Sequence, residues 1–429
     1  MNIFKQNKFL LICLVSLILP LAFFPRVGFA QNDFELQAKA AIAIDADSGK
    51  IFYKKNEDKV LPIASMTKLV TLYLILEAER DGVLSWDEEL TISDHLLKIS
   101  QDPELSNVPL NKNQAYSVRD LFNASTLVSA NAAVTALAEK VGGTEEKFVD
   151  LMREKVKTWG IEDAYLISTS GINNEDAKGR IYPGSKPHKE NLMSAKDMVI
   201  VARHLLQDFP EILETTKLTN TIFGQGTAEE TFINNTNLML PGMTYSRENV
   251  DGLKTGTTEL AGECFASTAI VNGHRIITII MHANDSYTDI DTGQRFIQTG
   301  ELLDYINNNW IYKVVYPKNS RIPTIKPLAI DNSKQRTTPL VTGADIGLWV
   351  RSDMKKDDLD LKFKPIKDLQ APLAKNKILG NVTVNLKNDT LGYLPGSQIQ
   401  HSYPMVTNHS IEKANFFERV KRSITDFFN

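Results

Sequence analysis

The hydrophobic positions of the chain change period along its length, and the first long region has a helical period. Apolar residues recur at spacings of three and four in several segments, which cover residues 65–81, 131–141 and 194–206 and also start at Val118 and after Thr144. Thr144 is suited to cap its helix, and Gly82 is suited to end the first one. The sequence therefore predicts a group of helices in this region.

Strand patterns flank these helices on both sides. The segments with this pattern cover residues 40–44, 51–53, 250–258, 264–271 and 275–281. The turn sequences Asp47-Ser48-Gly49 and Asn272-Gly273 predict a hairpin in each group. A helix is expected over 295–310, and a surface loop over 171–190. This order predicts an α+β domain over residues 31–316, with helices packed on an antiparallel sheet that unites its two ends.

A second domain is expected after Pro317. Short β-branched runs alternate there with Gly, Pro and Asn-Asp turns, which predicts a small all-β domain over residues 317–408. Residues 409–429 form an amphipathic pattern, with phenylalanine pairs on one face and Lys and Arg between them. We expect this C-terminal amphipathic helix to lie on a membrane surface. Docking on its own domain is the alternative.

The first 30 residues have the composition of a secretory signal peptide. Lys5 and Lys8 precede an apolar run over 9–19, and the small residues Gly28 and Ala30 suit cleavage after residue 30. An uncleaved membrane anchor is the alternative, but the run is short for a span and is followed by prolines. We therefore expect an exported protein.

Charge and cysteine content exclude several classes of function and of stabilising site. The chain has 48 Lys and Arg against 52 Asp and Glu, and removing residues 1–30 leaves 45 against 52, a net charge of −7. Such a mildly acidic protein lacks the positive electrostatic potential that attracts nucleic acid. Cys264 would be the one remaining cysteine, so no internal disulfide is expected. The scattered histidines form no metal-binding pattern, and neither a metal nor another cofactor is expected.

The organising chemical signal is Ser65-Met66-Thr67-Lys68, at the start of the first predicted helix. Residues i and i+3 share a helix face, so the Ser65 hydroxyl and the Lys68 amine are expected to meet. The positive end of the helix dipole disfavours an ammonium there, which favours a free amine that can activate a serine nucleophile. The alternative is a helix-capping Ser65 with a solvated Lys68, because S-x-x-K alone is a weak signal.

Two further motifs follow in order. Ser129-Ala130-Asn131 falls between two helical patterns, where a turn can project Ser129 and Asn131 into a cleft. Lys254-Thr255-Gly256-Thr257 lies on a predicted strand, where Gly256 would let a ligand approach closely. Each motif alone also fits a helix cap or a strand-end charge. Together, S-x-x-K, S-x-N and K-T-G on helix, turn and strand are the signature of the penicillin-recognising serine enzymes.

Within that superfamily the chain resembles the low-molecular-mass D-alanyl-D-alanine carboxypeptidases, penicillin-binding proteins of serine peptidase family S11. The resemblance extends over the signal peptide, the segment 251–256, Ala261-Gly262, Ala371-Pro372-Leu373 in the β domain, and the amphipathic tail. It implies removal of the terminal D-Ala from peptidoglycan stem peptides and covalent inhibition by β-lactams. It also implies a peripheral position on the outer face of the bacterial cytoplasmic membrane.

The same resemblance implies a role for each site residue. Ser65 would be the acylated nucleophile, Lys68 its base, and Ser129 the proton relay to the leaving amine. The substrate would be held by Asn131, Lys254, Thr255, Gly256, Thr257 and Arg295. The backbone N–H groups of Ser65 and Thr257 would form the oxyanion hole. Arg295 would bind the terminal carboxylate, whereas the sequence position alone suggests a solvated residue at a helix start.

Two positions depart from the family pattern, and two other functions stay open. Ala130 stands where many relatives have Gly, and Thr257 stands where the best-known relatives have His. A class A β-lactamase would need an S-D-N motif and a deacylating Glu, which the stretch around Tyr165 does not supply. A penicillin-sensing protein would be acylated without turnover, but such proteins normally carry a transmembrane signalling region, and no segment after residue 30 resembles one.

Overall fold

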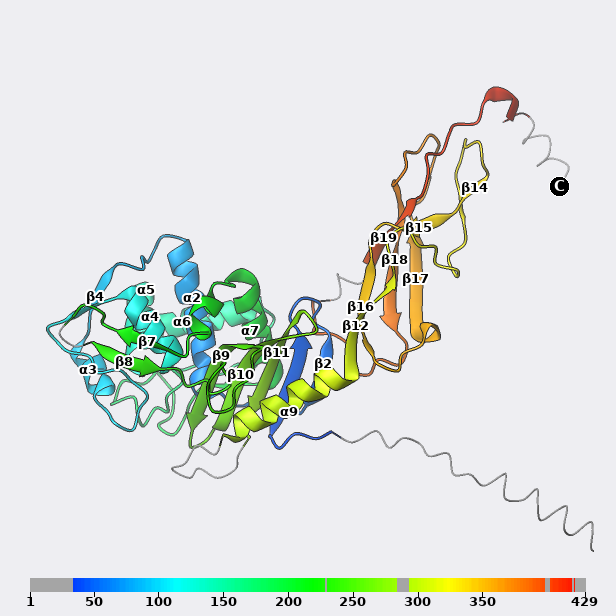
Figure 1. Cartoon of the computed structure of the whole chain (residues 1–429). Coiled ribbons are helices and arrows are strands. Elements are labelled where there is room, and N and C mark those ends of the chain that lie inside the picture. The colour runs from blue at the N-terminus through cyan, green and yellow to red at the C-terminus, as the bar shows by residue number, and fades with distance from the viewer. Residues whose placement is uncertain (1–33, 228–229, 284–292, 398–401, 419, 421–429) are drawn as a thin grey trace, which may run out of the picture. The chain divides into compact units, whose positions relative to one another are not determined.

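The computed structural model describes residues 34–227, 230–283, 293–397, 402–418 and 420 (Figure 1). The signal peptide predicted over residues 1–30 lies outside this part of the chain, and so does the end of the predicted C-terminal helix. Within the described ranges, no helix combines the length and the apolar character needed to cross a bilayer.

The first domain is built around a five-stranded antiparallel sheet with the strand order β2-β1-β11-β10-β9. Its strands are β1 (Ala40–Asp45), β2 (Ile51–Lys55), β9 (Val250–Thr258), β10 (Gly262–Val271) and β11 (His274–Met281). β1 pairs with β11 from Ala40 opposite Met281 to Asp45 opposite Ile276. The predicted sheet that unites both ends of the domain is therefore confirmed, as are the hairpins β1–β2 and β10–β11.

Helices cover both faces of this sheet. α7 (Ala195–Asp208) packs on β1 and β11, whereas α9 (Gln294–Asn309) packs on β10 and β11 and runs along the sheet in Figure 1. Every residue of β1 is buried, and so are residues 276–281 of β11. The continuous apolar runs of these strands, in place of strict alternation, are the sequence counterpart of burial on both faces.

The remaining helices form a second region of the same domain, which shares one core with the sheet. They are η2 (Ala64–Thr67), α2 (Lys68–Arg80), α3 (Asp94–Ser100), α4 (Val118–Leu127), α5 (Asn131–Gly142), α6 (Glu145–Thr158) and α8 (Ile212–Thr216). Thr144 caps α6 as predicted, accepting a hydrogen bond from the Lys147 backbone N–H at 3.3 Å. Gly82 follows α2 with a φ of 72°, the left-handed conformation that glycine adopts without steric cost.

Three pairs of short strands join loop segments of this domain, and the hydrophobic pattern of the sequence does not predict these pairs. They are β3 (Leu61–Pro62) with β6 (Leu192–Met193), β4 (Glu89–Thr91) with β5 (Ala115–Ser117), and β7 (Asn220–Phe223) with β8 (Thr231–Asn234). Strands of two to four residues are too short to show a period. The predicted surface loop at 171–190 contains neither helix nor strand.

The second domain is β-rich, as predicted. Its strands are β12 (Trp310–Tyr316), β13 (Leu328–Ala329), β14 (Thr337–Thr338), β15 (Leu340–Thr342), β16 (Ile346–Arg351), β17 (Leu359–Pro365), β18 (Ile378–Leu386) and β19 (Ser402–Thr407), with the short helix η3 (Lys356–Asp358). They form one sheet in the order β15-β19-β18-β17 and the pairs β12–β16 and β13–β14. The helix predicted to reach Trp310 ends one residue earlier, because Trp310 pairs with Arg351 and starts β12.

The C-terminal tail differs from its prediction at its start. Ile411 makes a β-bridge with Leu373 and Lys413 makes one with Ser333, so these residues are not helical. The physical reason is that the Ile411 side chain belongs to the core of the second domain. Residues 416–418 and 420 are helical. Phe416 and Phe417 there are 65% and 81% exposed, and residues 421–429 lie outside the described part.

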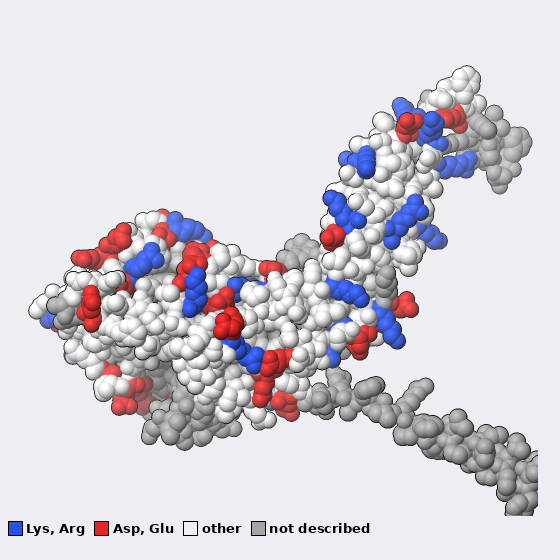
Figure 2. Space-filling model, viewed as in Figure 1, with Lys and Arg blue, Asp and Glu red and all other residues white. Residues whose placement is uncertain are grey.

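Charges on the molecular surface are mixed. On the face seen in Figure 2, Lys and Arg side chains are interspersed with Asp and Glu, in agreement with the small net charge of the sequence. In the described ranges, no group of three or more His, Cys, Asp or Glu is placed to hold a metal ion.

Candidate active site

Ser65 and Lys68 meet at the start of α2, although the first turn is not the α-helix predicted from residue 65. Residues 64–67 form the 3-10 helix η2, and the α-helix starts at Lys68. The Lys68 Nζ lies 2.9 Å from the Ser65 Oγ. Ser65 is half-buried, and Lys68 is fully buried. The alternative interpretation of a solvated Lys68 is therefore wrong.

Three oxygen atoms surround the Lys68 amine. Besides Ser65 Oγ, Nζ donates to Asn131 Oδ1 at 2.7 Å and to the Ser170 carbonyl oxygen at 2.8 Å. Burial lowers the pKa of Lys68 well below its usual value, and the charge of Lys254 lowers it further. A neutral amine has two N–H donors and one lone pair. The two carbonyl-type oxygens take the donors, which leaves the lone pair for the Ser65 hydroxyl proton.

The second motif lies on the turn between α4 and α5. Asn131 is the first residue of α5, and Ser129 precedes it with a φ of 64°, a conformation that is uncommon for a residue with a side chain. Ser129 is 4% exposed, and its Oγ has no hydrogen-bond partner among the described residues. A buried hydroxyl without a partner is what a site retains when its partner is the substrate.

The third motif occupies the edge strand β9. Lys254 is 1% exposed, and its Nζ donates to the Thr255 carbonyl oxygen at 3.1 Å. Burial, together with the charge of Arg295, lowers the pKa of Lys254 to about 7. A Cβ placed on Gly256 would lie 3.1 Å from the Ser65 backbone nitrogen. The glycine therefore lets this strand lie directly against the turn that carries Ser65.

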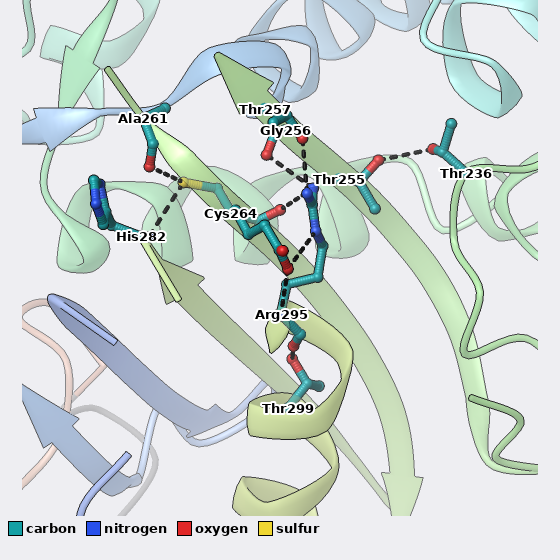
Figure 3. A network of polar contacts seen from close by, with 10 residues as sticks. Thr236, Thr255, Gly256, Thr257, Ala261, Cys264, His282, Arg295 and Thr299 are labelled. Carbon is teal, nitrogen blue, oxygen red and sulfur yellow. Dashed lines mark hydrogen bonds and ion pairs between the residues drawn. The ribbon is translucent and has the colours of Figure 1, made fainter. Parts of the chain in front are cut away.

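Arg295 is buried and not solvated, and Figure 3 shows its guanidinium pointing toward Gly256, Thr257 and Cys264. It is the second residue of α9 and is 1% exposed. Its Nη1 donates to the carbonyl oxygens of Gly256 and Cys264 at 3.0 and 3.2 Å, and its Nη2 donates to Thr257 Oγ1 at 2.8 Å. Thr257 is exposed. The guanidinium thus reaches the exposed face of β9 through the hydroxyl of Thr257, whose own proton stays available to a ligand.

A buried loop that sequence reasoning missed supports the Lys68 amine. Thr169 in this loop donates from its backbone N–H and its hydroxyl to Glu145 Oε1, at 3.1 and 2.9 Å. The next residue, Ser170, supplies the carbonyl oxygen that Lys68 contacts. Gly171 follows with a φ of 83°, and a Cβ there would lie 2.0 Å from the Ala64 carbonyl oxygen. Lys68 is contacted here by a backbone carbonyl, so no residue type in this loop could have predicted the contact.

Two more polar residues join the site from segments without any motif. Thr236 Oγ1 lies 2.7 Å from Thr255 Oγ1, so it extends the row of hydroxyls along β9. Asn191 donates to Thr67 Oγ1 at 3.0 Å and to the Ser168 carbonyl oxygen at 2.8 Å. It thereby connects the turn that carries Ser65 to the loop that contacts Lys68.

The comparisons with known proteins agree over nearly the whole chain. The profile of the D-alanyl-D-alanine carboxypeptidase family matches residues 27–285, and that of the C-terminal domain of penicillin-binding protein 5 matches residues 312–413. The chain is similar to a solved peptidoglycan synthesis regulatory factor (PBP3) from Streptococcus pneumoniae, with 36% identity and a TM-score of 0.75, covering 88% of this chain and 100% of that one.

Two further relatives widen the comparison. The D-alanyl-D-alanine carboxypeptidase DacF of Bacillus subtilis is 26% identical over 411 residues, which are 95% of this chain and 94% of that protein. Penicillin-binding protein D2 of Listeria monocytogenes, solved in the ampicillin-bound form, is 30% identical with a TM-score of 0.52, covering 64% of this chain and 98% of that one. The match to the family profile and the similarity of fold therefore agree with the three sequence motifs of this chain.

Proposed function

The chain belongs to the D-alanyl-D-alanine carboxypeptidase family, and on that premise we propose that it removes the terminal D-alanine from peptidoglycan stem peptides through an acyl-enzyme on Ser65. The observation that carries this assignment is the buried Lys68 amine, which lies between Asn131 Oδ1, the Ser170 carbonyl oxygen and Ser65 Oγ. Its lowered pKa supports a neutral base that can take the serine proton.

The proposed reaction has two stages. In the first, Ser65 Oγ attacks the carbonyl carbon of the D-Ala-D-Ala bond while its proton passes to Lys68. Ser129, whose buried hydroxyl has no partner in the described part of the chain, then gives its proton to the leaving amine and takes the proton held by Lys68. The C–N bond breaks and free D-alanine departs. In the second stage, water adds to the Ser65 ester and releases the shortened peptide, which restores the Ser65 hydroxyl.

The negative charge of the tetrahedral intermediate needs donors in place before the reaction. We assign this role to the backbone N–H groups of Ser65 and Thr257, which belong to the nucleophile turn and to the strand β9 packed against it. One donor of this kind contributes about 3 kcal/mol to stabilising the transition state. Lys254 adds a positive field beside the proton relay when it is protonated, and its pKa of about 7 makes this contribution pH-dependent.

Substrate recognition is assigned to the exposed edge of β9. Thr255 and Thr257 are two residues apart, so their side chains leave the strand on one face. Thr257 already accepts a hydrogen bond from Arg295, and its hydroxyl can donate to a terminal carboxylate. Asn131 and Gly256 complete the walls of the binding site. A β-lactam, whose strained amide resembles the D-Ala-D-Ala bond, would acylate the same serine, and the ampicillin-bound Listeria relative supports this.

We further propose that the protein is exported and attached to the outer face of the cytoplasmic membrane. Export is supported by the signal-peptide composition of residues 1–30. Attachment is supported by Phe416 and Phe417, which are largely exposed on the first turn of the tail helix. Basic residues follow them in the sequence and would be attracted to anionic lipid.

The direct test is to incubate the mature protein with a pentapeptide that ends in D-Ala-D-Ala and to assay free D-alanine. We expect release by the wild type and no release above background by Ser65→Ala. Intact-mass analysis with benzylpenicillin provides the second readout, because an adduct on the wild type should be absent from the variant. Rapid penicilloyl release without D-alanine release would indicate a β-lactamase, and a stable adduct without D-alanine release would indicate a sensor. Both outcomes contradict the proposal.

A further inference from the structure

A cavity outside the candidate active site combines a buried carboxylate with several aromatic rings. It has a volume of about 150 Å³ and is lined by residues of the β1–β2 turn, the start of β11, and strands β12, β16 and β19. None of the residues assigned above to catalysis or substrate binding lines it. A volume of this size accommodates a group as large as a benzene ring.

The carboxylate is that of Asp45, which is 2% exposed. One of its oxygens, Oδ2, accepts hydrogen bonds from the Ser48 backbone N–H at 2.7 Å and from the Ser48 hydroxyl at 2.5 Å. The other, Oδ1, has no hydrogen-bond partner among the described residues. His274 Nδ1 lies 3.9 Å from it, beyond hydrogen-bonding distance. A buried carboxylate oxygen without a hydrogen-bond donor is energetically costly, so a ligand that supplies a donor would stabilise it.

Aromatic rings form much of the remaining wall. The ring centroids of Tyr312 and Trp349 are 5.8 Å apart, and that of His274 lies 4.1 Å from the first and 5.0 Å from the second. Burial, followed by the charges of Asp45 and Asp47, raises the pKa of Tyr312, so the phenol stays neutral beside these carboxylates. Aromatic faces next to a carboxylate oxygen that has no hydrogen-bond donor attract organic cations.

Two basic side chains near this turn, Arg203 and Lys50, donate to acceptors other than Asp45 Oδ1. Arg203 donates to the backbone carbonyl oxygens of Ala46 and Asp47, at 2.7 and 2.9 Å. Lys50 donates to Asp389 Oδ1 at 3.0 Å and to the Gly392 carbonyl oxygen at 3.1 Å. Neither contact provides a donor for Asp45 Oδ1.

We propose that this cavity binds a small organic ammonium group, with Asp45 Oδ1 accepting its N–H and the rings of Tyr312 and Trp349 contacting its alkyl part. The ammonium can belong to a side chain of a peptide or to a free amine, and both present the same chemistry to the cavity. The inference goes beyond the proposed carboxypeptidase activity and does not depend on it.

The test uses the full mature protein without substrate or β-lactam. The indole N–H resonance of Trp349, assigned through Trp349→Phe, is followed while n-propylammonium chloride replaces sodium chloride at constant ionic strength. We expect a saturable shift. Asp45→Asn should weaken binding at least tenfold. Ser48→Ala, which removes the contacts of the hydroxyl and keeps the charge, should stay within threefold of the wild type.

A second pair of variants tests the ring without altering the charge. Tyr312→Phe keeps the ring and should bind as the wild type does, whereas Tyr312→Leu should bind about fivefold more weakly. Gly347→Ala should weaken binding similarly, because its Cβ would lie 2.3 Å from the Tyr312 hydroxyl oxygen and would displace that ring. Unchanged far-UV circular dichroism spectra of all of these variants check that the fold is intact.

Three outcomes would overturn the proposal. The first is a linear shift without saturation, which indicates a cavity that holds water alone. The second is an equal response to propan-1-ol, and the third is equal binding by Asp45→Asn. Measuring the binding of a lysine-containing stem peptide and of its Nε-acetyl form identifies the source of the ammonium. Tighter binding by the free-amine peptide than by propylammonium, lost on acetylation, identifies a peptide side chain. Equal binding by peptide and propylammonium identifies a free amine.

Discussion

At the level of single residues, the contacts of Lys68 predict separate effects on chemistry and on stability. Lys68→Ala removes the proposed base and should lower the rate of Ser65 acylation by benzylpenicillin by about 1,000-fold or more. It also leaves Asn131 Oδ1 and the Ser170 carbonyl oxygen without a donor, which should cost about 1–3 kcal/mol of folding stability. An intact-mass time course and a thermal melt measure the two effects. Lys140→Ala on α5 is the matched control, and near wild-type acylation by Lys68→Ala would contradict the assignment.

Arg295 donates to Thr257, and its proposed effect on the substrate through this hydroxyl leads to a second prediction. Arg295→Ala should lower kcat/KM at least tenfold for a peptide with a free terminal carboxylate and much less for its amidated analogue. Thr257→Val removes the hydroxyl between the two and should show the same selective loss. The double variant should be little worse than either single one, because both act in one chain of hydrogen bonds. Additive losses, or equal losses on both peptides, would show that Arg295 supports the fold instead.

Glu190 provides a prediction for pH. It is 1% exposed, and its Oε2 accepts a hydrogen bond from Thr258 Oγ1 at 2.7 Å. Burial raises the pKa of Glu190 from 4.5 to about 7. Because the unfolded chain then loses this proton at lower pH than the folded one, stability falls as pH rises from about 4.5 to 7.

Glu190→Gln keeps an acceptor for Thr258 and removes this titration. The variant should match the wild type in Tm at pH 4 and exceed it at pH 8, by a stability difference on the order of 2 kcal/mol. Thermal melts across this pH range measure the difference between the two proteins. A constant offset at all pH values would mean that Glu190 does not titrate in this window.

At the level of elements, the loop at 168–171 positions the nucleophile turn through a close backbone contact. Gly171→Ala would place a Cβ 2.0 Å from the Ala64 carbonyl oxygen, so it should displace that turn and lower the acylation rate at least a hundredfold. Gly179→Ala is the matched control, because its φ of 86° is similar and its Cβ would meet nothing within 4 Å. It should lose about 1–2 kcal/mol of stability and keep its acylation rate. Equal rates in both variants would contradict this role.

The elements also show what the sequence could and could not predict. The motifs at Ser65, Ser129 and Lys254 could be placed because each coincides with a strong local pattern, namely a helix start, a turn between helices and a strand. Ser170 could not, because it is 102 positions from Lys68 and contributes a backbone carbonyl, which leaves no trace in residue type. The burial of Arg295 was equally hidden, since an arginine at a helix start is usually solvated and here its partners come from two strands.

At the level of the whole molecule, the tail contains a boundary between the second domain and the proposed membrane anchor. Ile411 and Ala414 are buried, whereas Phe416 and Phe417 are exposed. Deleting residues 416–429 should therefore release a soluble and active enzyme from the membrane, and deleting residues 411–429 should also destabilise the second domain. Membrane fractionation and thermal melts of both truncations measure these outcomes. Retention of the shorter deletion in the membrane pellet would place the anchor elsewhere.

The pairing of β1 with β11 determines the order in which this molecule can form. Ala40 pairs with Met281, 241 positions later, and pairings so distant in the chain close slowly. During synthesis, which proceeds from the N-terminus, the apolar residues of β1 emerge long before their partner exists. The sheet stays open until β11 has been made. Such a delay keeps the polypeptide unfolded for longer, which is compatible with its proposed export across a membrane as an unfolded chain that folds on the far side.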